Sequence, residues 1–261
     1  QGALCFVDLN DGTGRLQTLL KQNVVGDESF NLFIETIDRG DFIGATGRLG
    51  LTKRKEPTLF AESWQILAKT LRPLPDKWHG LTDIEERFRR RYLDSFMDKE
   101  VKQRFFTRST IITTLRKFLN DARYLEVETP MLQPLSGGAS AVPFKTHHEA
   151  LDLPLYLRIS PELYLKRLLV GGFPRVYELS RCFRNEGIDA THQPEFTMLE
   201  FYEAYSDAET QRAFVEGLIK KLVRRITKAN RLTYNTQLIN FGDRFKVISF
   251  FDLLKRQALI A

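Results

Sequence analysis

The sequence predicts an α+β protein in which a small β-barrel domain precedes a second domain that mixes helices and strands. Residues 1–71 contain short apolar runs separated by turn-forming residues, a pattern typical of a small closed barrel. After residue 100 the apolar residues recur at the three- and four-residue spacing of helices, and strand-like runs lie between them. Pro73 and Pro75 remove backbone donors between the two regions and predict a domain boundary.

The N-terminal region begins with a predicted hairpin. Its strands are Ala3–Leu9 and Gly14–Leu20, and the turn at residues 10–14 consists of Asn-Asp-Gly-Thr-Gly, residues that tolerate positive φ. Two further strands are predicted at Phe42–Leu51 and Thr58–Leu67, on either side of a polar turn. The region is therefore interpreted as one β domain.

Residues 72–100 are predicted to form a linker. Within it, Ile84–Tyr92 is polar and rich in arginine, which indicates a connector helix whose charges usually form a solvated face. The second domain, residues 101–261, begins with apolar residues on one face of a helix, namely Ile111, Leu115, Phe118, Leu119 and Ala122. Tyr124–Pro130 then alternates like a strand that ends at proline.

A helix start in the second domain is predicted from its cap. Ser160 is the cap, Pro161 takes the first helical position and Glu162 faces the helix dipole, and the helix ends at Gly171. The remaining elements are two strands and two helices, at residues 175–184, 195–205, 211–228 and 250–261. The chain starts without methionine inside a strand and stops inside the last helix, so we expect an internal fragment.

The composition argues against several classes of protein. No run of about 18 apolar residues is present, so no membrane span is predicted. Cys5 and Cys182 form no disulfide framework and no zinc motif, and no signal peptide is recognised, which together predict a cytoplasmic protein. Both Gly-rich phosphate-binding motifs are absent. His147 and His148 would point to opposite sides of a strand and are not expected to bind metal.

The net charge of +6 suggests a nucleic-acid partner, but its distribution weakens that inference. Residues 211–261 carry eleven Lys and Arg against three Asp and Glu, a surplus larger than that of the whole chain. Residues 129–210 carry seven basic residues against eleven acidic ones. The middle of the chain therefore suits a cationic ligand better than a polyanion.

The most informative stretch is the pair of predicted strands on either side of residue 190. Phe196, Met198, Glu200 and Tyr202 share one face if that run is extended. A carboxylate among aromatic side chains needs a partner when it is buried. Two interpretations stay open, a binding face or a partly exposed strand with Glu200 in solvent. Arg184 offers a planar fork of donors for carboxylate or phosphate, although a lone Arg is often only a surface ion pair.

These residues carry a resemblance to a known family. Phe183–Gly187 together with Pro194–Thr197 is similar to motif 2 of class II aminoacyl-tRNA synthetases, and Phe105–Pro130 is similar to motif 1. Within the class, Met198–Tyr205 and the Arg-Asn-Glu-Gly segment at residues 184–187 resemble the members that are specific for lysine. Further similar segments lie at residues 71–77, 137–140 and 161–168. The whole chain resembles bacterial-type class II lysyl-tRNA synthetases, from within their OB-fold barrel to partway through their antiparallel-sheet catalytic domain.

The resemblance implies an ATP site. Arg184 would bind both the lysine carboxylate and the α-phosphate and act as the catalytic residue, by stabilising charge as pyrophosphate leaves. The residues implied in ATP binding are Arg184, Glu186, His192, Gln193 and Phe196, and Phe196 would stack on adenine. Gln193 stands where members of the family usually have Asn.

The resemblance also implies a lysine site formed by Gly138, Glu162, Arg184, Glu200 and Tyr202. Glu162 and the backbone at Gly138 would take the α-amino group. Glu200 and Tyr202 would receive the ε-ammonium group. A substrate without the distal charge would leave Glu200 desolvated and unpaired, which explains selectivity for lysine.

In the barrel, the resemblance implies that Phe6 and Gln17 read the anticodon, by stacking on a base and bonding its edge. The apolar pattern alone favours a core position for Phe6. Motif 1, with Pro130, implies a homodimer. Motif 3 and the residues that hold Mg²⁺ would lie beyond Ala261, so no metal ligand is expected in the chain. The implied protein is a lysine–tRNA ligase with tRNA(Lys), lysine and ATP as partners.

The residues leave three alternatives to a lysyl-tRNA synthetase. The nearest is a synthetase for aspartate or asparagine, but an anionic substrate would need Arg or Lys where this chain has Glu200 and Tyr202. A paralogue that lysylates a protein would lack the barrel. A non-catalytic RNA-binding or dimerisation module stays open for these 261 residues.

Overall fold

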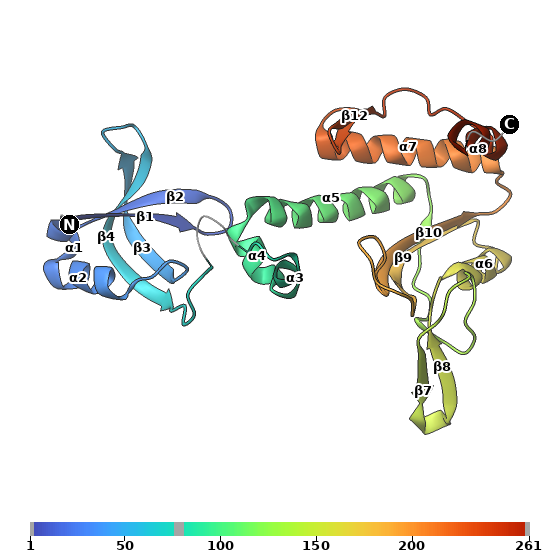
Figure 1. The fold of residues 1–261 in the computed structure, drawn as a ribbon, viewed down its shortest axis with the longest axis horizontal. Coiled ribbons are helices and arrows are strands. Elements are labelled where there is room, and N and C mark those ends of the chain that lie inside the picture. Colours follow the sequence, from blue (N-terminus) through green and yellow to red (C-terminus); the bar gives the residue numbers. More distant parts are fainter. Residues whose placement is uncertain (1–2, 76–80, 259–261) are drawn as a thin grey trace. The chain divides into compact units, whose positions relative to one another are not determined.

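The structure is a computed structural model that describes residues 3–75 and 81–258 (Figure 1). The chain divides into two compact units, residues 1–101 and 102–261. Residues 76–80 of the predicted linker and residues 259–261 of the predicted last helix lie outside the described residues.

The first unit contains the four predicted strands, β1 (Leu4–Asn10), β2 (Arg15–Lys21), β3 (Phe42–Leu51) and β4 (Pro57–Ala68). They form one sheet in the order β1-β2-β4-β3, in which only β2 and β4 are parallel. The predicted hairpin is confirmed. Its turn is held by Asp11, whose carboxylate accepts hydrogen bonds from the N–H groups of Thr13 and Gly14 at 2.8 and 3.0 Å.

The predicted closure of the barrel is not observed. Within the described part of the first unit, β1 and β3 are the edges of the sheet and do not pair with each other. A barrel of this kind uses about five strands, and four are described here.

Two helices in the first unit were not predicted, α1 (Gln22–Val25) and α2 (Asp27–Thr36). Phe30 and Phe33 of α2 are buried against Leu20 and Ala61 and form the core of the unit with them. The sequence does carry a signal for α2. Acidic residues occupy its first turn and two Phe residues follow at helical spacing.

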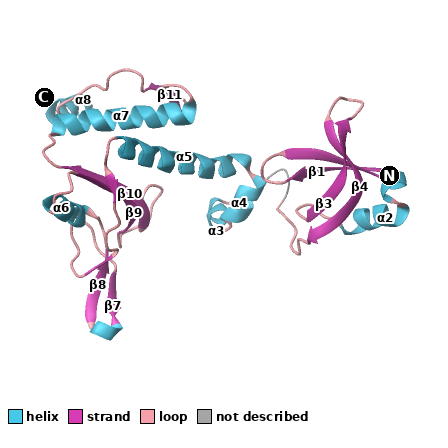
Figure 2. Cartoon of the chain, turned by 180° about the vertical axis from the view of Figure 1, so that it is seen from behind, coloured by secondary structure: helices cyan, strands magenta, loops and turns pink. Residues whose placement is uncertain are grey.

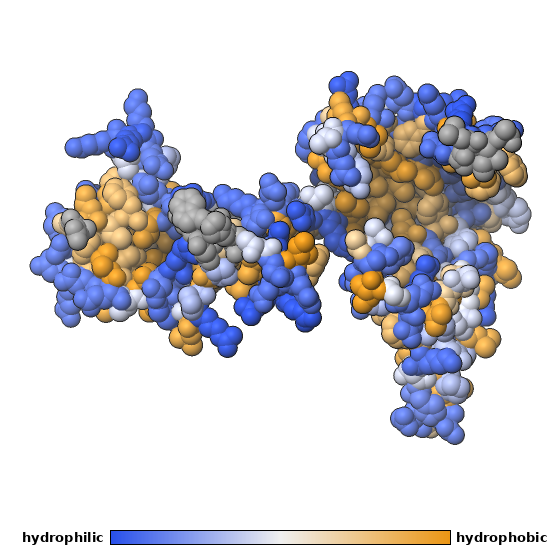
Figure 3. Space-filling model, viewed as in Figure 1, coloured by the Kyte–Doolittle hydropathy of each residue, from blue (hydrophilic) through white to orange (hydrophobic). Residues whose placement is uncertain are grey.

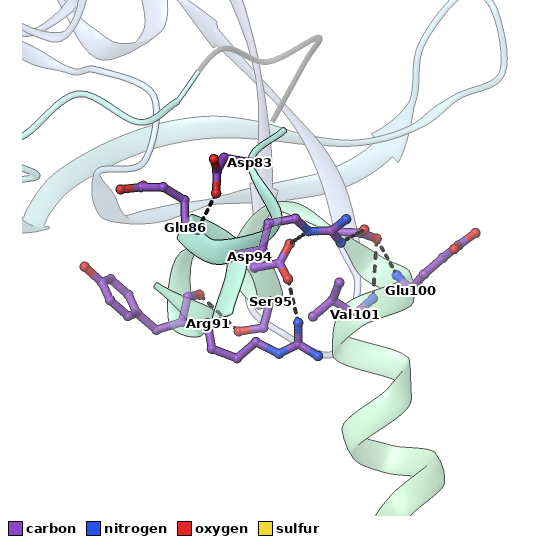
Figure 4. Close-up of polar contacts among 10 residues, drawn as sticks. Asp83, Glu86, Arg91, Asp94, Ser95, Glu100 and Val101 are labelled. Carbon is purple, nitrogen blue, oxygen red and sulfur yellow. Dashed lines mark hydrogen bonds and ion pairs between the residues drawn. The ribbon is translucent and has the colours of Figure 1, made fainter. Parts of the chain in front are cut away.

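The predicted connector helix consists of two helices, α3 (Ile84–Arg89) and α4 (Arg91–Met97). Their arginines are not simply solvated. Asp94 is buried, and its carboxylate lies 3.0 Å from Nε of Arg87 and 2.9 Å from NH1 of Arg91. Figure 4 shows Asp94 and Arg91 pointing toward each other. Arg87 on α3 and Asp94 on α4 therefore form an ion pair between the two helices. The charge run is therefore partly a structural ion-pair cluster.

The second unit is organised around a three-stranded sheet in the order β10-β9-β5. The strands are β5 (Leu125–Glu126), β9 (Arg175–Phe183) and β10 (Glu195–Glu203), with β9 and β10 antiparallel and β5 parallel to β9. The two long strands are confirmed. The strand predicted over Tyr124–Pro130 is reduced to two residues, because only Leu125 and Glu126 pair with β9.

Two long helices pack on this sheet, α5 (Lys99–Asp121) and α7 (Ala208–Thr227), and Figure 2 shows their place beside β10. The core contains the buried residues Leu119, Tyr124 and Tyr177, with Leu199, Phe201 and Phe214 packed against them. Leu119 lies on the helical face predicted from the sequence. Figure 3 shows hydrophobic residues on the side of α7 that faces the sheet, while its outer side is mostly hydrophilic.

The rest of the second unit consists of small elements. The sheet β6-β8-β7 is formed by β6 (Leu132–Gln133), β7 (Lys145–His148) and β8 (Leu153–Leu157), with a 3₁₀ turn at Glu149–Leu151. The others are α6 (Glu162–Val170), the hairpin β11 (Arg231–Tyr234) and β12 (Gln237–Asn240), and α8 (Phe250–Ala258). None of the described helices is long and apolar enough to cross a membrane.

Candidate functional site

A pocket of about 550 Å³ lies where β9 and β10 meet the loop that joins them. All five residues predicted to bind ATP line it, namely Arg184, Glu186, His192, Gln193 and Phe196. The antiparallel register explains this convergence, because Glu195 lies opposite Phe183 and the two strand ends meet at the loop. The pocket also contains Arg108 of α5 and Arg181 of β9, which were not predicted as site residues.

Arg184 is fixed at the end of β9 but keeps donors available. Its backbone N–H donates to the carbonyl of Pro194 at 2.8 Å, and its guanidinium lies 5.2 Å from the centre of the Phe196 ring. Such stacking orients the planar cation. Its buried Nε donates to no acceptor among the described residues. A buried donor without a partner is costly, so this geometry favours an anionic ligand that accepts from it.

The loop between the strands holds His192 through Asp189. One oxygen of Asp189 accepts from the N–H groups of Thr191 and His192 at 2.7 and 2.8 Å, and the other lies 2.7 Å from Nδ1 of His192. These hydrogen bonds, chiefly that of the Thr191 backbone, hold the pKa of Asp189 well below its usual range. Asp189 and Thr191 were missed, although Asp followed two residues later by Thr is a turn signal.

The second part of the site is the face of β10 that carries Glu200 and Tyr202. The hydroxyl of Tyr202 donates to Oε2 of Glu200 at 3.0 Å, and Ser160 donates to Oε1 at 2.7 Å. Glu200 is half-buried and both its oxygens are engaged, so it is not an exposed carboxylate in solvent. Burial, and then the hydrogen bond and charge of Glu200, raise the pKa of Tyr202.

Ser160 connects the two ends of the predicted lysine site. The cap position of α6 is Pro161 rather than Ser160 as predicted, and the helix begins at Glu162, but the Oγ of Ser160 still accepts from the N–H of Glu162 at 3.1 Å. A Cβ on Gly138 would lie 3.1 Å from the same oxygen and 3.1 Å from Cβ of Glu162. Gly138 has a φ of +88°, so the backbone favours glycine there and the space for a side chain is tight. The carboxylate of Glu162 pairs with Lys166 on the next turn of α6.

Ser160 was identified from the sequence only as a cap. Its bond to Glu200 spans 40 residues and depends on how α6 packs on the sheet, so no local pattern signals it.

The remaining predicted residues lie elsewhere. Pro130 is exposed and its carbonyl accepts from Nε2 of Gln133. In the first unit, Phe6 is 55% exposed on β1, and Gln17 accepts from the hydroxyl of Thr58 at 3.0 Å. Phe6 pairs with Leu19 and Gln17 with Asp8, so Phe6 and Gln17 are diagonal neighbours on one face of the hairpin. The core position that the apolar pattern favours for Phe6 is therefore wrong.

A family model described as tRNA synthetases class II (D, K and N) matches residues 83–258. The chain belongs to this family. A second model, described as an OB-fold nucleic acid binding domain, matches residues 1–67. The expected combination of an OB-fold domain and a class II synthetase domain is therefore confirmed.

Curated relatives of this class II synthetase chain are named lysine–tRNA ligases. The one from Roseiflexus castenholzii is 50% identical over 248 residues, which cover 95% of this chain and 51% of the relative. The relative from Carboxydothermus hydrogenoformans is 50% identical, and the match covers 95% of this chain and 50% of the relative. The relative from Aquifex aeolicus is 47% identical, and the match covers 98% of this chain and 43% of the relative. The chain spans about half the length of these relatives.

Proposed function

We propose that the full-length protein containing this chain is a lysine–tRNA ligase, which joins lysine to AMP at the expense of ATP and then transfers it to tRNA(Lys). The observation that carries the proposal is Glu200. It is a half-buried carboxylate whose partners are two neutral hydroxyl groups, and no described Lys, Arg or His pairs with it. An ammonium group of a substrate would supply the missing cation. The identity to lysine–tRNA ligases supports this choice.

In the proposed first step, the lysine carboxylate attacks the α-phosphorus of ATP in line and pyrophosphate leaves. Arg184 holds both reacting groups and stabilises the charge that develops on the phosphorus, while Phe196 stacks on adenine and Glu186, His192 and Gln193 hold the nucleotide. Glu162 and the backbone at Gly138 take the α-amino group. No covalent bond to the enzyme forms. In the second step, the terminal ribose of the tRNA takes the lysyl group and AMP leaves.

Mg²⁺ would neutralise charge on the phosphates when bound. The described residues contain no group of three ligating side chains that could hold a metal ion, so no residue of the chain is assigned to it. The homodimer contact at Pro130 and a cytoplasmic location stay predictions.

A synthetase for aspartate or asparagine is disfavoured, because the carboxylate of aspartate would be repelled by that of Glu200 and the neutral amide of asparagine would supply no cation to pair with it. The alternative of a non-catalytic binding module is tested by isothermal titration of the chain with lysine and with ATP. We expect heat from at least one of them. Silence for both would favour the binding-module interpretation for residues 1–261.

Ser160→Ala is expected to raise the KM for lysine by about tenfold, because Glu200 loses one of the two donors that orient it. The KM for ATP should be unchanged. Lysine-dependent pyrophosphate exchange by the full-length protein measures both values. Thr114→Val is a matched control, since it removes a hydroxyl that donates within α5. Equal effects of the two substitutions would contradict this role of Ser160.

Phe6→Ala is expected to raise the KM for tRNA about tenfold or more, because stacking on a base contributes about 1–3 kcal/mol. Pyrophosphate exchange, which needs no tRNA, should be unchanged. Phe42→Ala is the matched control, since Phe42 is 58% exposed on β3 of the same unit. A Phe6→Ala protein that charges tRNA with the original KM would remove Phe6 from the proposed anticodon site.

A further inference from the structure

A buried ion pair includes the residue that faces Glu200 on the neighbouring strand β9. Arg158 and Glu178 are each 2% exposed, and NH1 of Arg158 lies 2.6 Å from Oε1 of Glu178. Glu178 of β9 is the cross-strand partner of Glu200 of β10, so both carboxylates lie on the same face of the sheet. Two unpaired carboxylates in such positions repel each other, and one of them takes up a proton.

The hydrogen bonds of the pair hold it in one geometry. Oε2 of Glu178 accepts from the hydroxyl of Thr129 at 2.6 Å, so both carboxylate oxygens are occupied. Nε of Arg158 donates to the carbonyl of Arg181 at 2.8 Å, and NH1 also donates to the carbonyl of Thr129 at 3.1 Å. A buried pair with these additional bonds has little freedom to exchange partners.

The two acidic residues that lie with Glu200 in this part of the site therefore each have a cation partner, and Glu200 has none among the described residues. Glu178 has Arg158 as its cation, and Glu162 on α6 has Lys166. Glu200 receives only the hydroxyl groups of Ser160 and Tyr202.

Cys182 lies on the same face of β9 as Glu178, and the charges of both Arg158 and Glu200 act on its thiol. Burial raises the pKa of Cys182 to about 11, while the cation of Arg158 lowers it and the carboxylate of Glu200 raises it.

We propose that Arg158 is a positioning residue for the substrate cation. It balances the negative charge of Glu178, so that of the two facing carboxylates only Glu200 has an unbalanced charge with which to bind the ammonium group of lysine. This inference rests on the proposed function. Arg158 does not touch the substrate in this account. It acts by balancing the charge of Glu178, which lies opposite Glu200 on the neighbouring strand.

The test compares Arg158→Met with Arg158→Met/Glu178→Gln in the full-length protein, by lysine-dependent pyrophosphate exchange between about pH 6 and pH 8.5. In Arg158→Met the two carboxylates share a proton. We expect the KM for lysine to rise about tenfold or more at the acidic end and to fall as the pH rises. The double variant has no unpaired buried charge, so its KM should return to within about threefold of wild type, without the added pH dependence. The KM for ATP should stay within about threefold in both.

A double variant as impaired toward lysine as Arg158→Met, or an Arg158→Met protein with the pH profile of wild type, would overturn the inference. If Arg158→Met alone does not fold, the double variant decides: a KM for lysine near that of wild type supports the proposal, and a KM raised more than about tenfold overturns it. A wild type that activates no lysine overturns the proposed function and this inference together. If the wild type activates lysine but the KM of the double variant for lysine does not return toward the wild-type value, this inference alone is overturned.

Discussion

Glu200→Gln is expected to lower kcat/KM for lysine about a thousandfold, since removing one charge of a desolvated pair costs roughly 3–5 kcal/mol. The substitution keeps the size of the side chain and an oxygen for one of the two hydroxyl donors, Ser160 or Tyr202. It removes the negative charge that would pair with the ε-ammonium group, and its NH2 group takes the place of the second acceptor oxygen. The measurement is lysine-dependent ATP–pyrophosphate exchange by the full-length protein.

Glu203→Gln is the matched control for that experiment. Glu203 lies on the same strand and is also largely buried, but it accepts from Arg175 at 2.7 Å and from Tyr124 at 2.9 Å. Its substitution should lower stability and leave the KM for lysine nearly unchanged. A Glu200→Gln protein with near-normal exchange would show that the lysine pocket is wrongly assigned.

Arg184→Gln is expected to lower kcat about a thousandfold, because the transition state loses a preorganised charged donor. Arg184→Lys should recover only part of this loss, since an ammonium group lacks the planar fork that can hold the lysine carboxylate and the α-phosphate together. The unpartnered Nε of Arg184 and the ring of Phe196 beside it support this role. Single-turnover formation of the adenylate measures the step directly.

Arg181→Gln serves as the control for Arg184. Arg181 lines the same pocket but lies 3.5 Å from Glu195 and is half-exposed, so a loss of less than about tenfold is expected. An equal loss in the two variants would indicate a general effect of positive charge, and would contradict the specific role of Arg184.

Local chemistry made much of the fold predictable. The turn at residues 10–14 fixes the β1–β2 hairpin, because Asp11 holds it with hydrogen bonds that form within three residues. The strands β9 and β10 and the helix α7 follow from periodicity in the same way. The helix α2 has only a short local signal, and much of its stability comes from Phe30 and Phe33 packing on the sheet, which depends on the tertiary fold.

The site was predictable as far as motif residues go, and the pocket brings together the five residues predicted to bind ATP. The side chains that hold these residues were not predictable. Ser160 reaches Glu200 across 40 residues, and Arg158 reaches Glu178 across 20. Such contacts depend on strand register and on how α6 packs, and no periodicity in the sequence encodes them.

The most direct test of the account is the amino-acid dependence of ATP–pyrophosphate exchange by the full-length wild-type protein. Lysine, ornithine, norleucine, aspartate and asparagine are compared at equal concentration. The account predicts rapid exchange with lysine, much less with ornithine, and almost none with norleucine, which lacks the ammonium group that Glu200 would bind. Exchange with norleucine or aspartate as fast as with lysine would contradict it.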